Sequence, residues 1–260
     1  MNPTVVICPG AWPLVWFFQP LMESFEAQGY PAVCKVPDQY PTTDDPGNDL
    51  QTNPDTTFLR DNVLLPLIAE GKDVLLFMHS YGGVYGPQAL KGLSKAERKS
   101  QGLQGGVVAL IFVAAFVAPV GASAVSAMRF DPQNLPEWMH HDKATGLVAF
   151  KKDHAKAMLF HDLSDEEAER FADALPKQPW ACFSTTAQWD PFTDPHFAGT
   201  VGYIYTEADR ILPYEMQKLF AQQAHADKST VLEGSSHSPH IERPNELASI
   251  AIGLYGDITH

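Results

Sequence analysis

A serine at position 80 follows a buried strand and precedes a helix. The apolar run at residues 74–78 leads into His79, Ser80 and Tyr81, and two glycines and a helical stretch come next. A serine on such a strand-to-helix turn has strained backbone angles, and its hydroxyl projects above the sheet edge. The N–H groups at the start of the helix point toward the reacting atom. We therefore predict that Ser80 is a nucleophile.

The general base must be a histidine further along the chain. A serine hydroxyl attacks efficiently only when a base removes its proton, and histidine has a suitable pKa near neutrality. His237 and His240 follow a short apolar run near the end of the chain. His237 comes first in this loop, behind small residues, so we predict that it is the base. His240 is the alternative, and we expect it to pack at the start of the last helix or to line the rim.

An acidic residue must orient the base and stabilise its protonated form. Glu207 and Asp209 follow the strand-like run at residues 201–205. Parallel sheets place their sites beyond the carboxyl ends of their strands, where both this segment and the His237 loop lie. Asp209 is closer to the loop exit, so we predict that it is the acid, with Glu207 as the alternative. The order serine, acid, histidine is that of enzymes with a serine on a strand-to-helix turn.

Alternating strands and helices must position these residues. Short apolar runs predict six strands, at residues 5–8, 32–36, 74–78, 107–113, 201–205 and 230–232. Helical patterns lie between and after them, at residues 17–28, 55–70, 82–93, 214–224 and 244–254. Near-continuous apolar strands alternating with helices indicate a mainly parallel six-stranded sheet with helices on both faces. The fold class is therefore α/β.

The alternation stops between residues 120 and 198, a stretch rich in proline and aromatic residues. Ser164 and Glu167 form a capping box at the start of a helix within it. We predict a helical cap at residues 120–198, inserted after the fourth strand and covering the site. Residues 1–119 and 199–260 form the core of what is a single domain overall.

Composition excludes several classes of function. The 260 residues carry a formal net charge of −13, without the basic cluster that nucleic acid binding requires. The longest apolar run is too short to span a bilayer, and the N-terminus lacks signal-peptide features. Three widely spaced cysteines indicate free buried thiols in a reducing compartment. We expect a cytoplasmic protein with no nucleic acid or membrane partner, and a homodimer is compatible with the sequence.

The motifs together resemble the plant-type methyl esterase and hydroxynitrile lyase branch of the α/β-hydrolase superfamily. The matching stretches are CPGAW at residues 8–12, HSYGG at 79–83, FVAAFVAP at 112–119, YTEADR at 205–210 and SHSP at 236–239. Their order and spacing fit over nearly the whole chain outside the cap. The resemblance implies an α/β-hydrolase fold and a serine hydrolase that needs no metal or cofactor. Four cap histidines, at residues 140, 141, 154 and 161, match no metal-ligand spacing.

The resemblance also implies an oxyanion hole built from the backbone N–H groups of Ala11 and Tyr81. Two residues depart from the family motifs. Pro9 replaces the usual histidine before Gly10, and Met78 replaces the first glycine of the G-x-S-x-G elbow. The first departure affects how the loop is supported, and the second requires space for a bulky side chain.

Two further differences favour ester hydrolysis over cyanohydrin cleavage. The lyases that the chain resembles carry a lysine directly after the catalytic histidine, where this chain has Ser238. They also carry a threonine hydroxyl in the first oxyanion loop, where Ala11, Trp12 and Pro13 offer none.

We therefore expect cleavage of a small, largely apolar carboxylic ester, lactone or thioester through an acyl-enzyme. Ligand pockets are mostly apolar, and the aromatic residues expected to line this one are Trp12, Phe116, Trp138, Phe160 and Trp189. Two alternatives would use the same fold. One is a non-hydrolytic enzyme, such as a C–C lyase or cyclase in a biosynthetic pathway, and the other is a non-catalytic ligand receptor.

Overall fold

A six-stranded sheet forms the centre of the computed structural model, which describes residues 2–38 and 52–259. The strand order is β2-β1-β3-β4-β8-β9, and every neighbouring pair is parallel. The strands are β1 (Thr4–Cys8), β2 (Ala32–Cys34), β3 (Asp73–His79), β4 (Gly106–Val113), β8 (Val201–Thr206) and β9 (Lys228–Leu232). All six predicted strands are confirmed, and the predicted α/β fold class with them.

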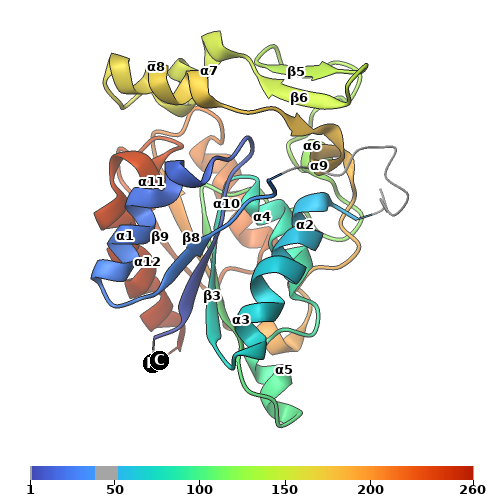
Figure 1. The fold of residues 1–260 in the computed structure, drawn as a ribbon, viewed down its shortest axis with the longest axis vertical. Helices are drawn as coiled ribbons and strands as arrows, with labels where there is room; N and C mark the ends of the chain where they lie inside the picture. The colour runs from blue at the N-terminus through green and yellow to red at the C-terminus, as the bar shows by residue number, and fades with distance from the viewer. Residues whose placement is uncertain (1, 39–51, 260) are drawn as a thin grey trace.

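Helices cover both faces of the sheet (Figure 1). On one face, α1 (Gln19–Ala27) packs beside α12 (Pro244–Thr259). On the other face lie α2 (Pro54–Leu59), α3 (Leu65–Ala69) and α4 (Gly82–Tyr85). The remaining helices of the core are η1 (Val15–Phe18), η3 (Pro87–Leu90), α5 (Lys95–Ser100), α10 (Tyr214–Gln223) and α11 (Pro239–Glu242). None of the described helices combines the length and the apolar character needed to cross a membrane.

The helix predicted over residues 55–70 contains an irregular turn. A π-helical turn, η2 (Arg60–Leu64), separates α2 from α3, and the N–H of Leu65 bonds to the carbonyl of Arg60. Pro66 follows, and proline has no N–H to donate and crowds the carbonyl four residues earlier. The wider turn makes room for the proline ring. The kink expected from the sequence is thus absorbed by a π turn.

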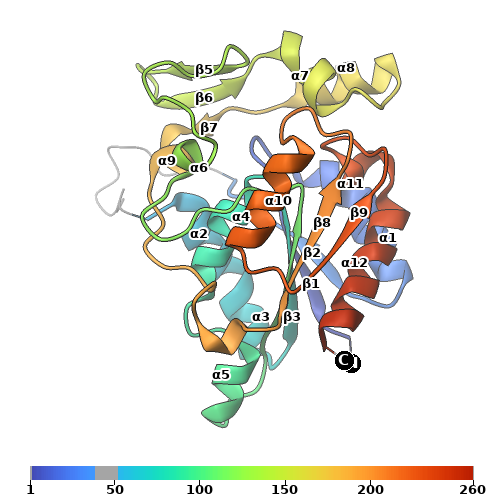
Figure 2. The same ribbon diagram turned by 180° about the vertical axis from the view of Figure 1, so that it is seen from behind.

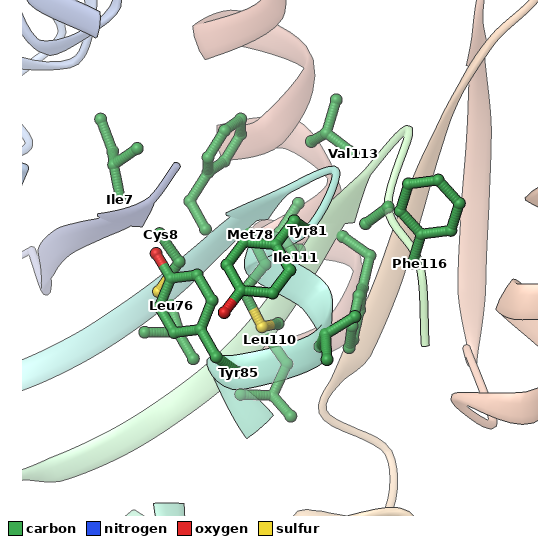
Figure 3. Close-up of a cluster of buried hydrophobic side chains, with 14 of the residues drawn as sticks. Ile7, Cys8, Leu76, Met78, Tyr81, Tyr85, Leu110, Ile111, Val113 and Phe116 are labelled. Carbon is green, nitrogen blue, oxygen red and sulfur yellow. The ribbon is translucent and has the colours of Figure 1, made fainter. Parts of the chain in front are cut away.

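The core is densest where β3 and β4 lie side by side. Figure 3 shows Leu76, Met78, Leu110 and Ile111 from these strands packed beneath Tyr81 at the start of α4. Both strands are buried on both faces, which explains their near-continuous apolar sequence. Because the strands are parallel, their carboxyl ends reach the same edge of the sheet. That edge receives the loops that carry the predicted site.

Most of the segment between β4 and β8 lies beyond this edge in both views (Figures 1 and 2), and we call this part the cap. Its helices are α6 (Ala124–Ala127), α7 (Lys152–Leu159), α8 (Asp165–Ala174) and α9 (Trp180–Ser184). The segment ends with η4 (Pro195–Phe197), which packs beside α5 instead. The cap also contains a three-stranded antiparallel sheet of β5 (Met139–Asp142), β6 (Leu147–Phe150) and β7 (Gln178–Pro179). The placement of the insertion after the fourth strand is confirmed. The boundaries at residues 120 and 198 stay a prediction.

The predicted helical cap therefore contains a small sheet as well as helices. The turn between β5 and β6 explains why the hairpin forms. The side chain of Asp142 accepts hydrogen bonds from the N–H of Ala144 at 3.0 Å and the hydroxyl of Thr145 at 2.8 Å. Gly146 has a φ of 68°, which glycine adopts without a steric penalty. The N-cap predicted at Ser164 is confirmed for α8, because the hydroxyl of Ser164 accepts the N–H of Glu167 at 3.3 Å.

Candidate active site

The three predicted catalytic side chains form one hydrogen-bonded row. The Oγ atom of Ser80 lies 2.8 Å from Nε2 of His237, and Nδ1 of His237 lies 2.7 Å from Oδ2 of Asp209. Ser80 comes from the turn between β3 and α4, Asp209 from the loop after β8 and His237 from the loop after β9. A carboxylate only accepts hydrogen bonds, so Nδ1 carries the proton and Nε2 is left to accept from the serine hydroxyl. This arrangement can activate a serine.

Ser80 lies on a tight turn with a φ of 53°. Its N–H donates to the carbonyl of Val113 at 3.1 Å, and its own carbonyl accepts the N–H of Gly83 at 3.1 Å. A Cβ on Gly82 would lie 2.2 Å from the carbonyl oxygen of Cys8, and one on Gly83 would lie 2.3 Å from that of Phe116. The two glycines are therefore required for the helix to pack this close to the strands.

Met78, the departure from the elbow motif, fits because of a third glycine. Its side chain is fully buried. A Cβ on Gly86 would lie only 2.9 Å from the sulfur of Met78. Because Gly86 has no side chain, it leaves the space that the side chain of Met78 fills.

Pro9, the second departure, leaves the first loop supported by other contacts. The hydroxyl of Tyr85 donates to the carbonyl of Pro9 at 3.4 Å. A Cβ on Gly10 would lie 3.2 Å from the Cβ of Ser80. The loop therefore runs directly beside the nucleophile. Ala11 and Tyr81 both line the cavity above Ser80.

Asp209 is held by several donors. Its Oδ1 accepts the N–H groups of Ile211 and Leu212, both at 2.8 Å, and its Oδ2 accepts the hydroxyl of Thr206 at 3.1 Å. Burial raises the pKa of the Asp209 carboxyl, but the charge and hydrogen bond of His237 and the two N–H groups outweigh burial. The pKa of Asp209 therefore lies below its ordinary value of 3.8. The carboxyl is ionised at neutral pH, as an orienting acid must be.

The two alternative residues have other contacts. Glu207 is exposed and accepts the N–H of Gly234 at 2.9 Å, which braces the start of the His237 loop. His240 is buried at the start of α11, and its ring stacks on Phe18 with 4.1 Å between centroids. Burial lowers the pKa of His240 well below 6.5. His240 thus lies in the short helix before the last one, and it lines the cavity.

Sequence reasoning missed a role for His79. Its Nε2 lies 2.7 Å from the carbonyl oxygen of His237, and a carbonyl only accepts, so Nε2 carries the proton. Burial, followed by the nearby His237, lowers the pKa of His79 to about 3. His79 is therefore neutral at physiological pH. The only signal in the sequence was a polar residue at the end of an apolar strand.

An apolar cavity opens above Ser80. It encloses about 740 Å³, its open mouth included. Four of the five predicted aromatic residues line it, namely Trp12, Phe116, Trp138 and Phe160. Further aromatic lining comes from Phe17, Phe18, Phe150 and Phe183. The polar side chains at the cavity are Ser80, Tyr81, His79, His237, Ser238 and His240.

Trp189, the fifth predicted residue, does not line this cavity. It packs against Phe197 instead, with 6.3 Å between ring centroids. The aromatic residues of a cap either face the core site or hold the cap together. Their spacing in the sequence does not distinguish these roles, because the distinction depends on how the cap folds.

One group of possible metal ligands occurs in the described part of the chain. Side-chain ligand atoms of Glu97, Asp194 and His196 lie within 4.8 Å of one another. None of the three lines the cavity above Ser80. Asp194 already caps η4 by accepting the N–H of His196 at 2.9 Å. The group is thus separate from the serine chemistry.

Comparison with known proteins agrees with this geometry. A model of the alpha/beta hydrolase family matches residues 5–250. The chain belongs to the alpha/beta hydrolase family. This membership confirms the predicted fold and the prediction that the protein is an enzyme of the hydrolase type.

Other members of the alpha/beta hydrolase family resemble the chain from end to end. The alpha/beta hydrolase nvfD of Aspergillus novofumigatus is 24% identical over 99% of this chain and 98% of its own. Polyneuridine aldehyde esterase has a TM-score of 0.72 at 15% identity, covering 98% of this chain and 99% of its own. Methylesterase MES16 from Arabidopsis has a TM-score of 0.68 at 18% identity, with the same coverage. The predicted resemblance to the plant-type esterase branch is confirmed.

Proposed function

We propose that the protein is a serine esterase that cleaves a small, largely apolar carboxylic ester, with a lactone or thioester as chemically equivalent substrates. The observation that carries this proposal is the row from Ser80 through His237 to Asp209, with contacts of 2.8 and 2.7 Å, at the floor of an apolar cavity. Esterases among the structural neighbours support it, since polyneuridine aldehyde esterase and a methylesterase share the fold.

The first half of the reaction forms an acyl-enzyme. The Oγ of Ser80 attacks the ester carbonyl carbon while Nε2 of His237 takes its proton. The carbonyl oxygen becomes an oxyanion held by the N–H groups of Ala11 and Tyr81, and loss of one such donor typically costs about 3 kcal/mol of barrier. His237 then gives its proton to the leaving alcohol, and the acyl group remains on Ser80.

The second half releases the acid. Water attacks the acyl carbon while His237 takes its proton, the bond to Ser80 breaks, and His237 returns the proton to the serine oxygen. Asp209 stabilises the imidazolium in both halves without accepting the proton itself. Every step is an acid–base or nucleophilic step, so these residues need no cofactor.

The cavity indicates what the substrate resembles. Its walls are aromatic and aliphatic, and its polar side chains cluster near Ser80 and His237. An apolar acyl or alcohol group can fill the space between the cap and the core, while its carbonyl meets the polar floor. Among the residues that the structure describes, no lysine or arginine lines the cavity, so this lining offers no such cation to a second, anionic group on the substrate.

The decisive experiment combines covalent labelling with turnover. Wild type, Ser80→Ala and the exposed control Ser184→Ala are treated with a fluorophosphonate, and the intact mass is measured. Turnover of p-nitrophenyl acetate and butyrate is measured in parallel. We expect one adduct on wild type and Ser184→Ala, and neither adduct nor turnover for Ser80→Ala. Equal turnover in all three proteins, without labelling at Ser80, would overturn the proposal and favour a ligand receptor.

A non-hydrolytic reaction gives a different result in the same experiment. A lyase or cyclase that uses the same three residues is labelled at Ser80 but turns over neither ester. Labelling without ester turnover would therefore keep the activated serine and reject the esterase.

A further inference from the structure

A buried chain of hydrogen bonds joins the two loops that carry the proposed oxyanion donors. The N–H of Trp12 donates to Oε1 of Gln178 at 2.9 Å, and Nε2 of Gln178 donates to Oδ2 of Asp55 at 2.9 Å. The hydroxyl of Tyr81 donates to the same Oδ2 at 2.9 Å. All four residues are buried. The chain therefore runs from one side of Ser80 to the other by way of α2 and the cap strand β7.

Hydrogen-bonding chemistry fixes the orientation of the Gln178 amide. A carboxylate accepts but does not donate, so Gln178 turns its amide nitrogen toward Asp55, and its amide oxygen faces the N–H of Trp12. The hydroxyl oxygen of Tyr81 accepts Nδ2 of Asn53 at 2.9 Å, and its proton can go to Oδ2 of Asp55 at 2.9 Å or to Oδ1 of Asn53 at 3.2 Å. One oxygen of Asp55 thus contacts both a core tyrosine and a cap glutamine.

The oriented amide of Gln178 holds the backbone N–H of Trp12. Trp12 has a φ of 54°, an uncommon conformation for a bulky side chain, which persists only when surrounding contacts enforce it. Both of its hydrogen bonds go to the cap, because its indole Nε1 donates to the carbonyl of Val148 at 3.0 Å. Ala11, the proposed oxyanion donor, immediately precedes it. Gln178 thus holds the peptide between Ala11 and Trp12, which directly follows the peptide that carries the Ala11 N–H.

We propose that Gln178 and Asp55 are positioning residues that align the oxyanion hole. Gln178 acts through Trp12 on Ala11, and Asp55 acts through Gln178 and through Tyr81. The cap then does more than enclose the substrate, because Gln178 in its strand β7 holds the core loop that carries one oxyanion donor. This inference rests on the proposed function, since it assumes that Ala11 and Tyr81 stabilise an oxyanion.

The proposal can be tested by exchanging the carboxylate and the amide between positions 55 and 178. Gln178→Glu places a second carboxylate against Asp55 and removes the donor between them, although an oxygen still faces Trp12. Adding Asp55→Asn restores a donor toward position 178 and returns the pair to a single carboxylate. The proton of Tyr81 then turns to its other acceptor, Oδ1 of Asn53, which lies 3.2 Å away. Gln188→Glu makes the same chemical change at an exposed cap position and serves as the matched control.

Three quantities are measured for each variant. These are kcat and KM for p-nitrophenyl butyrate, the inhibition constant of an alkyl trifluoromethyl ketone, and the thermal unfolding midpoint. The ketone adds Ser80 and places its oxygen in the oxyanion hole, so its affinity reports on that hole. For Gln178→Glu we expect kcat to fall about 10- to 100-fold, with a parallel loss of ketone affinity and little change in KM.

The double variant decides between positioning and general disruption. We expect Asp55→Asn with Gln178→Glu to recover most of the lost kcat and ketone affinity, and Gln188→Glu to behave as wild type. Unchanged kcat in Gln178→Glu would overturn the inference, and so would a folded double variant that remains as slow as the single one. If Gln178→Glu does not fold, Gln178→Ala replaces it: a loss of kcat and ketone affinity supports positioning, and unchanged values overturn it.

Failure of the proposed function gives a separate signature. Wild type would then neither hydrolyse p-nitrophenyl butyrate nor bind the ketone at Ser80. An active wild type with unaffected variants rejects only the positioning role of Gln178 and Asp55.

Discussion

The ring of His79 holds the backbone of His237. Nε2 of His79 donates to the carbonyl oxygen of His237 across 2.7 Å, and the two ring centroids lie 5.0 Å apart. His79 is the residue directly before the nucleophile. The end of β3 therefore presents the serine and also anchors the loop that carries the base.

Removing this anchor should slow the reaction. In His79→Leu the His237 loop loses a buried hydrogen bond, and small displacements of catalytic groups cost large factors in rate. We expect kcat for p-nitrophenyl butyrate to fall about 10-fold or more, with labelling of Ser80 slowed in proportion. His140→Leu, at an exposed cap histidine, is the control. Equal kcat in both variants would show that the contact does not position His237.

Replacing each of the two candidate carboxylates in turn should show which one orients His237. Asp209→Asn keeps the shape of the side chain but favours the wrong tautomer of His237, so we expect kcat to fall by a factor on the order of 10⁴. Glu207→Gln should retain kcat within about threefold, because Glu207 contacts only the loop start at Gly234. Steady-state kinetics of the two variants test this. A larger loss in Glu207→Gln than in Asp209→Asn would reverse the assignment.

Acid should destabilise the folded protein as the pH falls below 6.5. The ordinary pKa of histidine is 6.5, and His79 in the folded chain has a pKa of about 3. Between these values the unfolded chain binds a proton that the folded chain does not, so stability is full above pH 6.5 and falls as the pH drops. The slope is about 1.4 kcal/mol per pH unit for each such histidine. The pKa of His240 is lowered in the same direction.

Urea unfolding between about pH 7 and pH 4 measures this slope. His240→Leu should show a shallower loss of stability than wild type, because one buried histidine no longer takes up a proton on unfolding. The contribution of Asp209 is lost only as the pH falls through its folded pKa, below 3.8, so it does not affect this range. Identical slopes for wild type and His240→Leu would contradict the prediction.

The cap wall should influence which acyl groups are accepted. Trp138 lines the cavity and stacks on Phe150, with ring centroids 4.8 Å apart. Trp138→Ala removes apolar surface that a longer acyl chain would bury, so we expect the preference for butyrate over acetate to fall about 3- to 10-fold in kcat/KM. Trp189→Ala is the control, because Trp189 packs outside the cavity. A similar change of preference in both variants would refute this role for Trp138.

Local patterns in the sequence were sufficient for the sheet and for the row of three side chains. The strand runs are near-continuously apolar because parallel strands are buried on both faces. Ser80, Asp209 and His237 each follow such a run directly. Because the carboxyl ends of parallel strands lie at one edge of the sheet, predicting the strands also predicts that these three residues lie close together. The glycines after Ser80 could be understood in the same way, since only glycine allows α4 to approach the end of β1 and the loop after β4 so closely.

Only the tertiary structure decided which residues support that row. His79 is 158 positions from His237, and Trp12 is 166 positions from Gln178. The first contact depends on how the ends of β3 and β9 meet, the second on how the cap docks, and neither leaves a periodic signal in the chain. The same reason explains Trp189, which packs on Phe197 outside the cavity. The residue types of the candidate site thus follow local patterns, whereas the hydrogen bonds that support them join distant segments and form only in the folded chain.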